Sequence, residues 1–384
     1  MLRVFSIAPP RLGGLDLLIP IYIEMKRCGN VSIELIVEND LILKQLKRDK
    51  FLHRKLFDNI DKITFIRRKR VNSSSNLFIK FLNIFLVVWK LLGISFRIFN
   101  SKAPILMHSS HLGDWLVRLM NKLVKKKKGI TVAHCKLMTL PKKFENDQKN
   151  FGDIFLCFND AFISHRDSII KNRYISIGYP RLYESWLSTL RNNSKHYVDK
   201  EIRVPLSCNE KPLSVLFLPS TVKGVFEENE LKEWIIEVLS SLSKVFPESL
   251  VVLKPHPMQD MEHLKALLKS QSYHTYFISF LNPGLLASEA RVVISHHSST
   301  IIDALALQTP VIQHQVLTNH WVKRHPEGSK FLKLGHPWTK DTLSLINELN
   351  KVKNNDWTQP KFLSKLEHNN SIKQFFDRIN LSYK

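Results

Sequence analysis

The chain has 384 residues, 44% of them hydrophobic, and its 57 Lys and Arg against 34 Asp and Glu give a formal net charge of +23. This length suffices for two domains with buried cores, and the composition is that of a globular protein. The four cysteines show no disulfide or zinc spacing. The N-terminus is expected to be a strand rather than a signal peptide, and no run reaches the length needed to cross a membrane.

The first half of the chain alternates short apolar runs with helical patterns. Strands are predicted at 4–8, 32–38, 63–66, 104–107, 130–133 and 153–158. After a turn at Gly13 and Gly14, a helix is predicted over 15–28, and another over 41–54. Strands that alternate with helices indicate βαβ units and a parallel sheet.

The same alternation restarts after a polar stretch. It predicts strands at 213–218, 249–253, 291–294 and 310–312, with helices at 227–245, 261–269 and 299–307. We therefore expect a first domain over 1–180, a linker over 181–212 and a second domain over 213–350. The last segment, 351–384, is expected to be helical and able to cross back to the first domain.

The segment 77–99 is an unusually apolar helical stretch. Its few polar residues fall in an arc of roughly 100°. Two interpretations stay open: a helix buried in the first domain, or an interfacial helix that dips into the acyl boundary of a membrane. The preceding Arg67–Arg70 run favours the membrane, because basic residues are attracted to anionic lipid.

The strongest local motif is VVLKPHP, residues 251–257. The apolar strand ends at Lys254, and Pro255 and Pro257 on either side of His256 stiffen the loop. This places His256 at the carboxyl edge of the sheet. A lysine and a histidine there suit a phosphate or diphosphate leaving group.

A second motif, VVISHHSSTIIDALALQTPVIQH over 292–314, again ends a strand in a polar loop. Ser298, Ser299 and Thr300 precede or begin a helix, where free N–H groups and hydroxyls favour an anion. Asp303, one turn further, can accept hydrogen bonds from ribose hydroxyls. Ordinary N-capping is the alternative explanation for the serines.

Together, K-P-H-P and S-S-T-x-x-D-A-L-x-x-x-T-P-V-I resemble the nucleotide-binding half of bacterial GT-B transferases. That group includes capsule polysaccharide synthesis proteins, sialyltransferases with "HP" and "SS" motifs, and CDP-glycerol glycerophosphotransferases. The GYPR segment at 178–181 is similar to their G-x-P joint. The resemblance implies an α/β GT-B fold, in which two Rossmann-like domains face each other across a cleft, acceptor domain first. It also implies a nucleotide site containing Lys254, His256, Pro257, Ser220, Thr221, Ser298, Ser299, Thr300 and Asp303.

The first half departs from the family pattern, because it lacks the acidic D/E-D/E-G motif of the sialyltransferases. Asp114 and His111, in HSSHLGDW, are the candidates for the general base. His256 is the third candidate catalytic residue. Gly13, Gly14 and His134 are expected on the acceptor side. A metal site from His108, His111 and Asp114 is conceivable but lacks a fourth ligand, so we expect no metal and no cofactor beyond the nucleotide-sugar co-substrate.

These features predict a glycosyltransferase that moves a sugar from a CMP- or UDP-linked donor to a lipid-linked or growing glycan of a bacterial surface, capsule or lipopolysaccharide. The alternatives are a CDP-glycerol-type glycerophosphotransferase, a nucleotide-sugar epimerase and a nucleic-acid-binding protein. No nucleic-acid-binding pattern is present, so no nucleic-acid partner is expected. We expect a cytoplasmic protein held peripherally at an anionic membrane surface through Arg67–Arg70, Lys125–Lys128 and 77–99.

Overall fold

The structure is a computed structural model of the whole chain. It describes residues 1–9, 12–38, 40–66, 77–109, 115–134, 152–157, 174–202, 213–218, 228–256, 259, 261–269, 276–296, 298, 300–315, 338–359 and 371–382. The chain divides into two compact units. The first unit contains Met1–Trp186 and Leu366–Lys384, and the second contains Leu187–Lys365.

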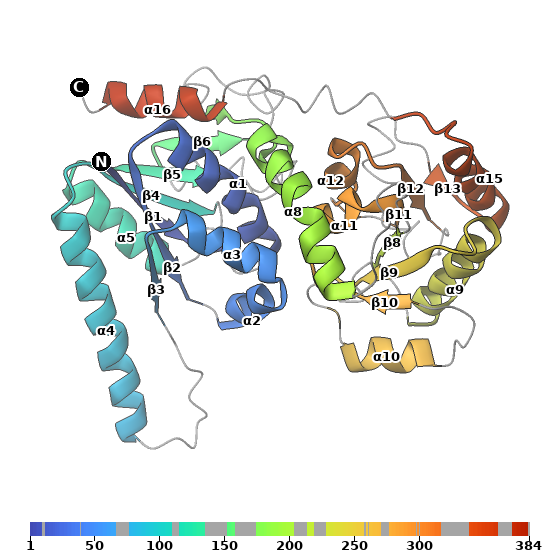
Figure 1. Ribbon diagram of the computed structural model, residues 1–384. Coiled ribbons are helices and arrows are strands. Elements are labelled where there is room, and N and C mark those ends of the chain that lie inside the picture. Colours follow the sequence, from blue (N-terminus) through green and yellow to red (C-terminus); the bar gives the residue numbers. More distant parts are fainter. Residues whose placement is uncertain are drawn as a thin grey trace. The chain divides into compact units, whose positions relative to one another are not determined.

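The first unit is built on a seven-stranded parallel sheet in the order β3-β2-β1-β4-β5-β6-β7 (Figure 1). Its strands are β1 (Leu2–Ile7), β2 (Val31–Val37), β3 (Lys62–Phe65), β4 (Pro104–Ser109), β5 (Ile130–His134), β6 (Ile154–Cys157) and β7 (Tyr174–Ser176). The order reverses between β1 and β4. In a doubly wound sheet, ligands bind beyond the carboxyl ends of the strands at such a point.

Helices cover both faces of this sheet. They are α1 (Leu12–Cys28), α2 (Asp40–Arg48), α3 (Lys50–Asn59), α4 (Leu77–Phe99), α5 (Trp115–Lys126) and α16 (Ser371–Ser382). Right-handed crossovers place α1, α2 and α3 on one face, and α4 and α5 on the other. Ile94 and Ile98 of α4 and Met120 and Val124 of α5 share one buried cluster with Leu106 of β4.

The C-terminal helix α16 belongs to the first unit, although it follows the second in sequence. Phe375 and Ile379 of α16 are fully buried. Arg378 Nη1 donates a hydrogen bond to the carbonyl of Tyr174 in β7 over 3.4 Å. The last helix therefore completes the core of the first unit.

The second unit contains a six-stranded parallel sheet in the order β10-β9-β8-β11-β12-β13. Its strands are β8 (Leu213–Phe217), β9 (Leu250–Lys254), β10 (Tyr276–Ile278), β11 (Ala290–Ser295), β12 (Val311–His314) and β13 (Trp338–Thr339). Its helices are α9 (Glu228–Val245), α10 (Met261–Lys269), α11 (Pro283–Ser288), α12 (Thr300–Ala306) and α15 (Thr342–Lys353). The 3-10 turn η3 (Pro180–Leu182) belongs to the first unit, and helix α8 (Glu184–Ile202) begins at the end of the first unit and continues into the second.

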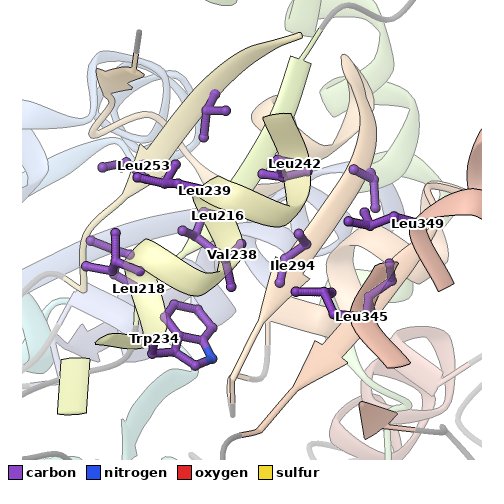
Figure 2. Packing of buried hydrophobic residues seen from close by; sticks show 14 of the residues in the cluster. Leu216, Leu218, Trp234, Val238, Leu239, Leu242, Leu253, Ile294, Leu345 and Leu349 are labelled. Atoms are coloured by element: carbon purple, nitrogen blue, oxygen red, sulfur yellow. The ribbon is translucent and has the colours of Figure 1, made fainter. Parts of the chain in front are cut away.

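The core of the second unit forms between the sheet and helices α9 and α15. Trp234 and Val238 of α9 pack with Ile294 of β11 and with Leu345 and Leu349 of α15 (Figure 2). Each of these side chains is at most 1% exposed. This packing fixes α9 against the strands whose ends carry the two sequence motifs.

Two predicted elements differ from the structure. The linker expected over 181–212 contains helix α8, because its buried Leu190 and Val198 supply a helical apolar stripe that the polar composition conceals. Glu201 of α8 accepts hydrogen bonds from Ser279 Oγ (2.7 Å) and Phe280 N (3.2 Å), which ties the helix to the second unit. The single helix expected over 41–54 is two helices, because Asp49 caps α3 by accepting from Leu52 N.

Candidate functional site

The carboxyl ends of four adjacent strands form the candidate site in the second unit. Phe217 of β8 is in register with Lys254 of β9 on one side and with Ser295 of β11 on the other. Ser295 is in turn in register with Gln313 of β12. The two motifs, separated by about forty residues in sequence, therefore leave the same carboxyl edge of the sheet on either side of β8.

The K-P-H-P motif leaves the edge as β9 ends. Lys254 is half-buried, Pro255 is buried and His256 is exposed. The carbonyl of Lys254 accepts a hydrogen bond from Leu218 N over 3.0 Å, which fixes the end of β9 to the end of β8. Pro257 lies outside the described residues, as do Ser220 and Thr221 of the loop after β8.

The S-S-T loop lies at the end of β11. Ser298 Oγ accepts from Thr300 N (3.3 Å) and lies 2.8 Å from Thr300 Oγ1, so it caps the first turn of α12. Asp303 is 4% exposed and lies inside that turn. Capping and anion binding use the same N–H groups, so the cap is compatible with both interpretations. Ser299 lies outside the described residues.

Sequence reasoning missed a buried polar cluster beside this loop. His314, at the end of β12, is fully buried, and its Nδ1 lies 2.8 Å from Thr339 Oγ1. Its Nε2 lies 3.5 Å from Glu237 Oε2 of α9, and this interaction lowers the pKa of the Glu237 carboxyl below its usual range. The Trp234 ring stacks on His314 and meets His296 edge-on.

Two further buried groups add hydrogen-bonding capacity to this edge. Ser295 Oγ and the side-chain amide of Gln313 are inaccessible to solvent and have no hydrogen-bond partner among the described residues. Nearly all buried polar groups in proteins are hydrogen-bonded. The polar residues in the sequence IQHQ, at the end of an apolar strand, were the signal in the sequence for this cluster. Only the pairing of β11 with β12 brings Ser295 and Gln313 together.

The first unit carries histidines at its corresponding edge. His134 ends β5 and pairs in register with Ser109, the last residue of β4, which follows His108. Both histidines are buried. Burial lowers the pKa of His108, and its Nδ1 lies 2.8 Å from the Ser109 carbonyl, so a neutral ring donates through Nδ1. The candidate bases His111 and Asp114 lie outside the described residues.

No group of three or more His, Cys, Asp or Glu in the described part of the chain is arranged to hold a metal ion. Of the three residues considered for a metal, the structure describes His108 alone.

The expected turn at Gly13 and Gly14 is wrong, because both glycines lie in the first turn of α1. A Cβ on Gly14 would lie 2.8 Å from both Cβ and Cγ of Pro9, whereas one on Gly13 would meet nothing within 4 Å. Gly14 therefore allows Pro9, in the segment after β1, to lie close to the helix. The two glycines have different structural roles.

This difference predicts opposite effects of alanine at neighbouring positions. Gly14→Ala should lower the free energy of unfolding by about 1–3 kcal/mol, the usual cost of overpacking. Gly13→Ala should leave it unchanged or raise it by up to about 1 kcal/mol, because alanine is the better helix former. Urea denaturation of the two variants measures both; equal effects would contradict the tight contact with Pro9.

The sequence matches no protein-family profile and no curated protein, but solved structures are similar over the whole chain. UDP-GlcNAc 2-epimerase from Methanocaldococcus jannaschii is 12% identical, with a TM-score of 0.57 over 99% of each chain. The Neisseria meningitidis enzyme bound to UDP-GlcNAc is 13% identical, with a TM-score of 0.57 over 99% of this chain and 100% of that one. Anabaena HepE in complex with UDP-glucose is 9% identical, with a TM-score of 0.51 over 99% and 98%.

The chain has a GT-B fold. Its two Rossmann-like parallel sheets are those expected from the sequence, and the similarity extends through both units. At these identities the similarity establishes the fold alone.

Proposed function

We propose that the protein is a nucleotide-sugar-dependent glycosyltransferase whose donor binds at the carboxyl edge of the second sheet. The observation that carries this proposal is that Lys254 and the exposed His256 follow β9, and Ser298 and Asp303 follow β11, at the same carboxyl edge of one sheet. A cation, hydroxyls and helix N–H groups suit a diphosphate, and a buried carboxylate suits ribose hydroxyls. The similar structures of HepE with UDP-glucose and of the Neisseria enzyme with UDP-GlcNAc support a UDP-linked donor.

In this proposal the first unit binds the acceptor, a glycan or lipid-linked glycan. Transfer requires a group that accepts the proton of the attacking hydroxyl. His134 ends β5, and His108 is the second-last residue of the adjacent β4. Burial lowers the pKa of His108, which favours its neutral imidazole. His111 and Asp114, which follow β4 in sequence, remain candidates for the base. His256 would stabilise the departing phosphate.

A second candidate is a UDP-sugar 2-epimerase, because several similar structures carry that name. Epimerisation needs no acceptor, whereas transfer does. Incubating the protein with UDP-GlcNAc and following the anomeric signals by NMR separates the two. Conversion of the sugar without acceptor would establish epimerisation and overturn the proposed transfer.

The donor class is tested by thermal unfolding with UDP, CMP, CDP and GDP. A ligand that binds only the folded state at a hundred times its Kd stabilises it by about 2.7 kcal/mol. We expect UDP or CMP to raise the Tm, and uridine or cytidine without phosphate to have a much smaller effect. CDP as the preferred nucleotide would favour a glycerophosphotransferase. The absence of a shift with every nucleotide would contradict the proposed site.

A further inference from the structure

Helix α4 exposes most of its described apolar side chains. Of the fourteen large hydrophobic side chains exposed in the described part of the chain, ten lie on this helix. Phe81, Trp89 and Phe96 are 68%, 66% and 69% exposed. A surface helix of a globular protein normally turns its apolar stripe inward, and an exposed apolar patch of this kind marks an interaction site.

The helix is nevertheless firmly attached to the first unit. Ile94 and Ile98 are fully buried in the cluster formed by α4, α5 and the sheet. Arg97 donates two hydrogen bonds to the Glu34 carboxylate of β2, at 2.7 and 2.6 Å. Glu34 also accepts from Thr64 Oγ1 of β3 over 2.6 Å. Helix α4 therefore exposes these apolar side chains although it is packed against the first unit.

The exposed arc is too wide for one helix contact. At 3.6 residues per turn, the exposed apolar positions between Phe81 and Phe99 span about 200° of the circumference. The opposite arc contains Lys90 and Arg97 together with the buried Ile94 and Ile98. A stripe that packs against a protein core is typically about 100° wide or somewhat more, so one packing contact with a second protein would leave part of this surface in water.

The neighbouring helix α5 presents positive charge beside this surface. Arg118, Lys122, Lys125 and Lys126 are exposed, and α5 contains no acidic residue. Because α4 and α5 pack together on the same face of the sheet, their outer faces point to the same side of the first unit. The apolar surface therefore has a basic border on one side, which complements an anionic surface.

We propose that the exposed face of α4, bordered by the basic residues of α5, docks onto an anionic lipid bilayer. The helix axis would run along the membrane surface, with Phe81, Phe85, Trp89 and Phe96 in the acyl boundary. Aromatic residues on one face and Lys or Arg on the other are typical of interfacial helices. Within the residues that the structure describes, no helix is long and apolar enough to cross a membrane.

The orientation of α4 connects this surface to the acceptor side of the proposed function. Helix α4 runs opposite to the parallel strands that it connects, so its N-terminal turns lie towards their carboxyl edge and extend past the sheet (Figure 1). His108 and His134 lie at that edge. A lipid-linked acceptor anchored in the bilayer would enter there; this last step rests on the proposed function, whereas docking itself does not.

The test is flotation of the full chain with vesicles of phosphatidylcholine, with and without phosphatidylglycerol. The triple variant Phe81→Ser, Phe85→Ser and Trp89→Ser should lower the partition coefficient at least about 100-fold, because three large apolar side chains no longer enter the membrane. With phosphatidylglycerol in the vesicles, the partition coefficient should fall about five-fold in each of the single variants Arg118→Gln, Lys122→Gln and Lys126→Gln. Without phosphatidylglycerol, these variants should partition like the wild type. Lys125 is left unchanged because it pairs with Asp153.

The matched control is Phe57→Ser in α3, on the opposite face of the sheet, where Phe57 is 47% exposed. This variant should float like the wild type. All variants should keep the nucleotide-dependent Tm shift, which separates this proposal from the donor site. The proposal is overturned if the wild type does not float, or if sedimentation shows a dimer that the triple variant dissociates while neither protein floats.

Discussion

His256→Ala and Ser298→Ala should each lower the turnover of donor by about 10²- to 10³-fold. In the proposed donor site, each removes one preorganised group from the place where negative charge would develop on the leaving phosphate. Neither should unfold the protein. His256 is exposed, and loss of the Ser298 cap of α12 costs about 1 kcal/mol. The measurement is initial rate at saturating donor, with far-UV circular dichroism as a check of folding.

Two controls make this result specific. His196→Ala removes an exposed histidine from α8 in the same unit and should leave turnover unchanged. Ser298→Thr keeps the hydroxyl and should recover most of the activity lost in the alanine variant. Turnover close to that of the wild type in both alanine variants would overturn the assignment of this edge as the donor phosphate site.

Arg181→Met should lower the free energy of unfolding by about 3–5 kcal/mol, because it removes one partner of a buried ion pair. Arg181 Nη2 lies 2.5 Å from Asp16 Oδ2, and the two side chains are 7% and 8% exposed. The pair joins α1 to the turn η3 that follows β7. Urea denaturation followed by circular dichroism measures the loss.

An exposed ion pair in the same unit provides the comparison. Lys26 and Asp61 lie 2.7 Å apart with side chains 30% and 46% exposed, and Lys26→Met should cost at most about 1 kcal/mol. Asp16→Leu combined with Arg181→Met should be less destabilising than Arg181→Met alone, because no unpaired charge remains. A loss below about 1 kcal/mol in Arg181→Met would show that Asp16 is solvated or paired elsewhere.

The Arg181 pair also shows where a motif and its structural role separate. In sequence, the GYPR segment indicated a joint between domains. In the structure, Gly178 has a φ of 65°, which glycine adopts without strain, and Arg181 is paired with Asp16, 165 residues earlier in the chain. No local pattern identifies a partner at that distance, so the buried pair was not predicted.

The sequence by itself determined the two parallel sheets and the positions of both motifs of the proposed donor site. Apolar runs that end in proline, histidine or serine mark buried strands and their exits, and these signals are local. β9 ends at Lys254 and β11 at Ser295, as the patterns of K-P-H-P and S-S-T require. The periodicity also placed α10 at Met261–Lys269, as predicted. Strand ends of a parallel sheet meet at one edge, so the candidate site could be predicted without knowing the tertiary contacts.

The tertiary structure alone decided which polar groups are buried and which apolar groups are exposed. His314 and Glu237 are 77 residues apart and meet only because α9 packs across β12. The apolar pattern of α4 was compatible with burial and with exposure, and the attachment of Arg97 to Glu34 sets which arc faces outward. The physical reason is the same in both cases. Periodicity specifies which residues of a helix or strand share a face, but the partner of that face is supplied by residues distant in sequence.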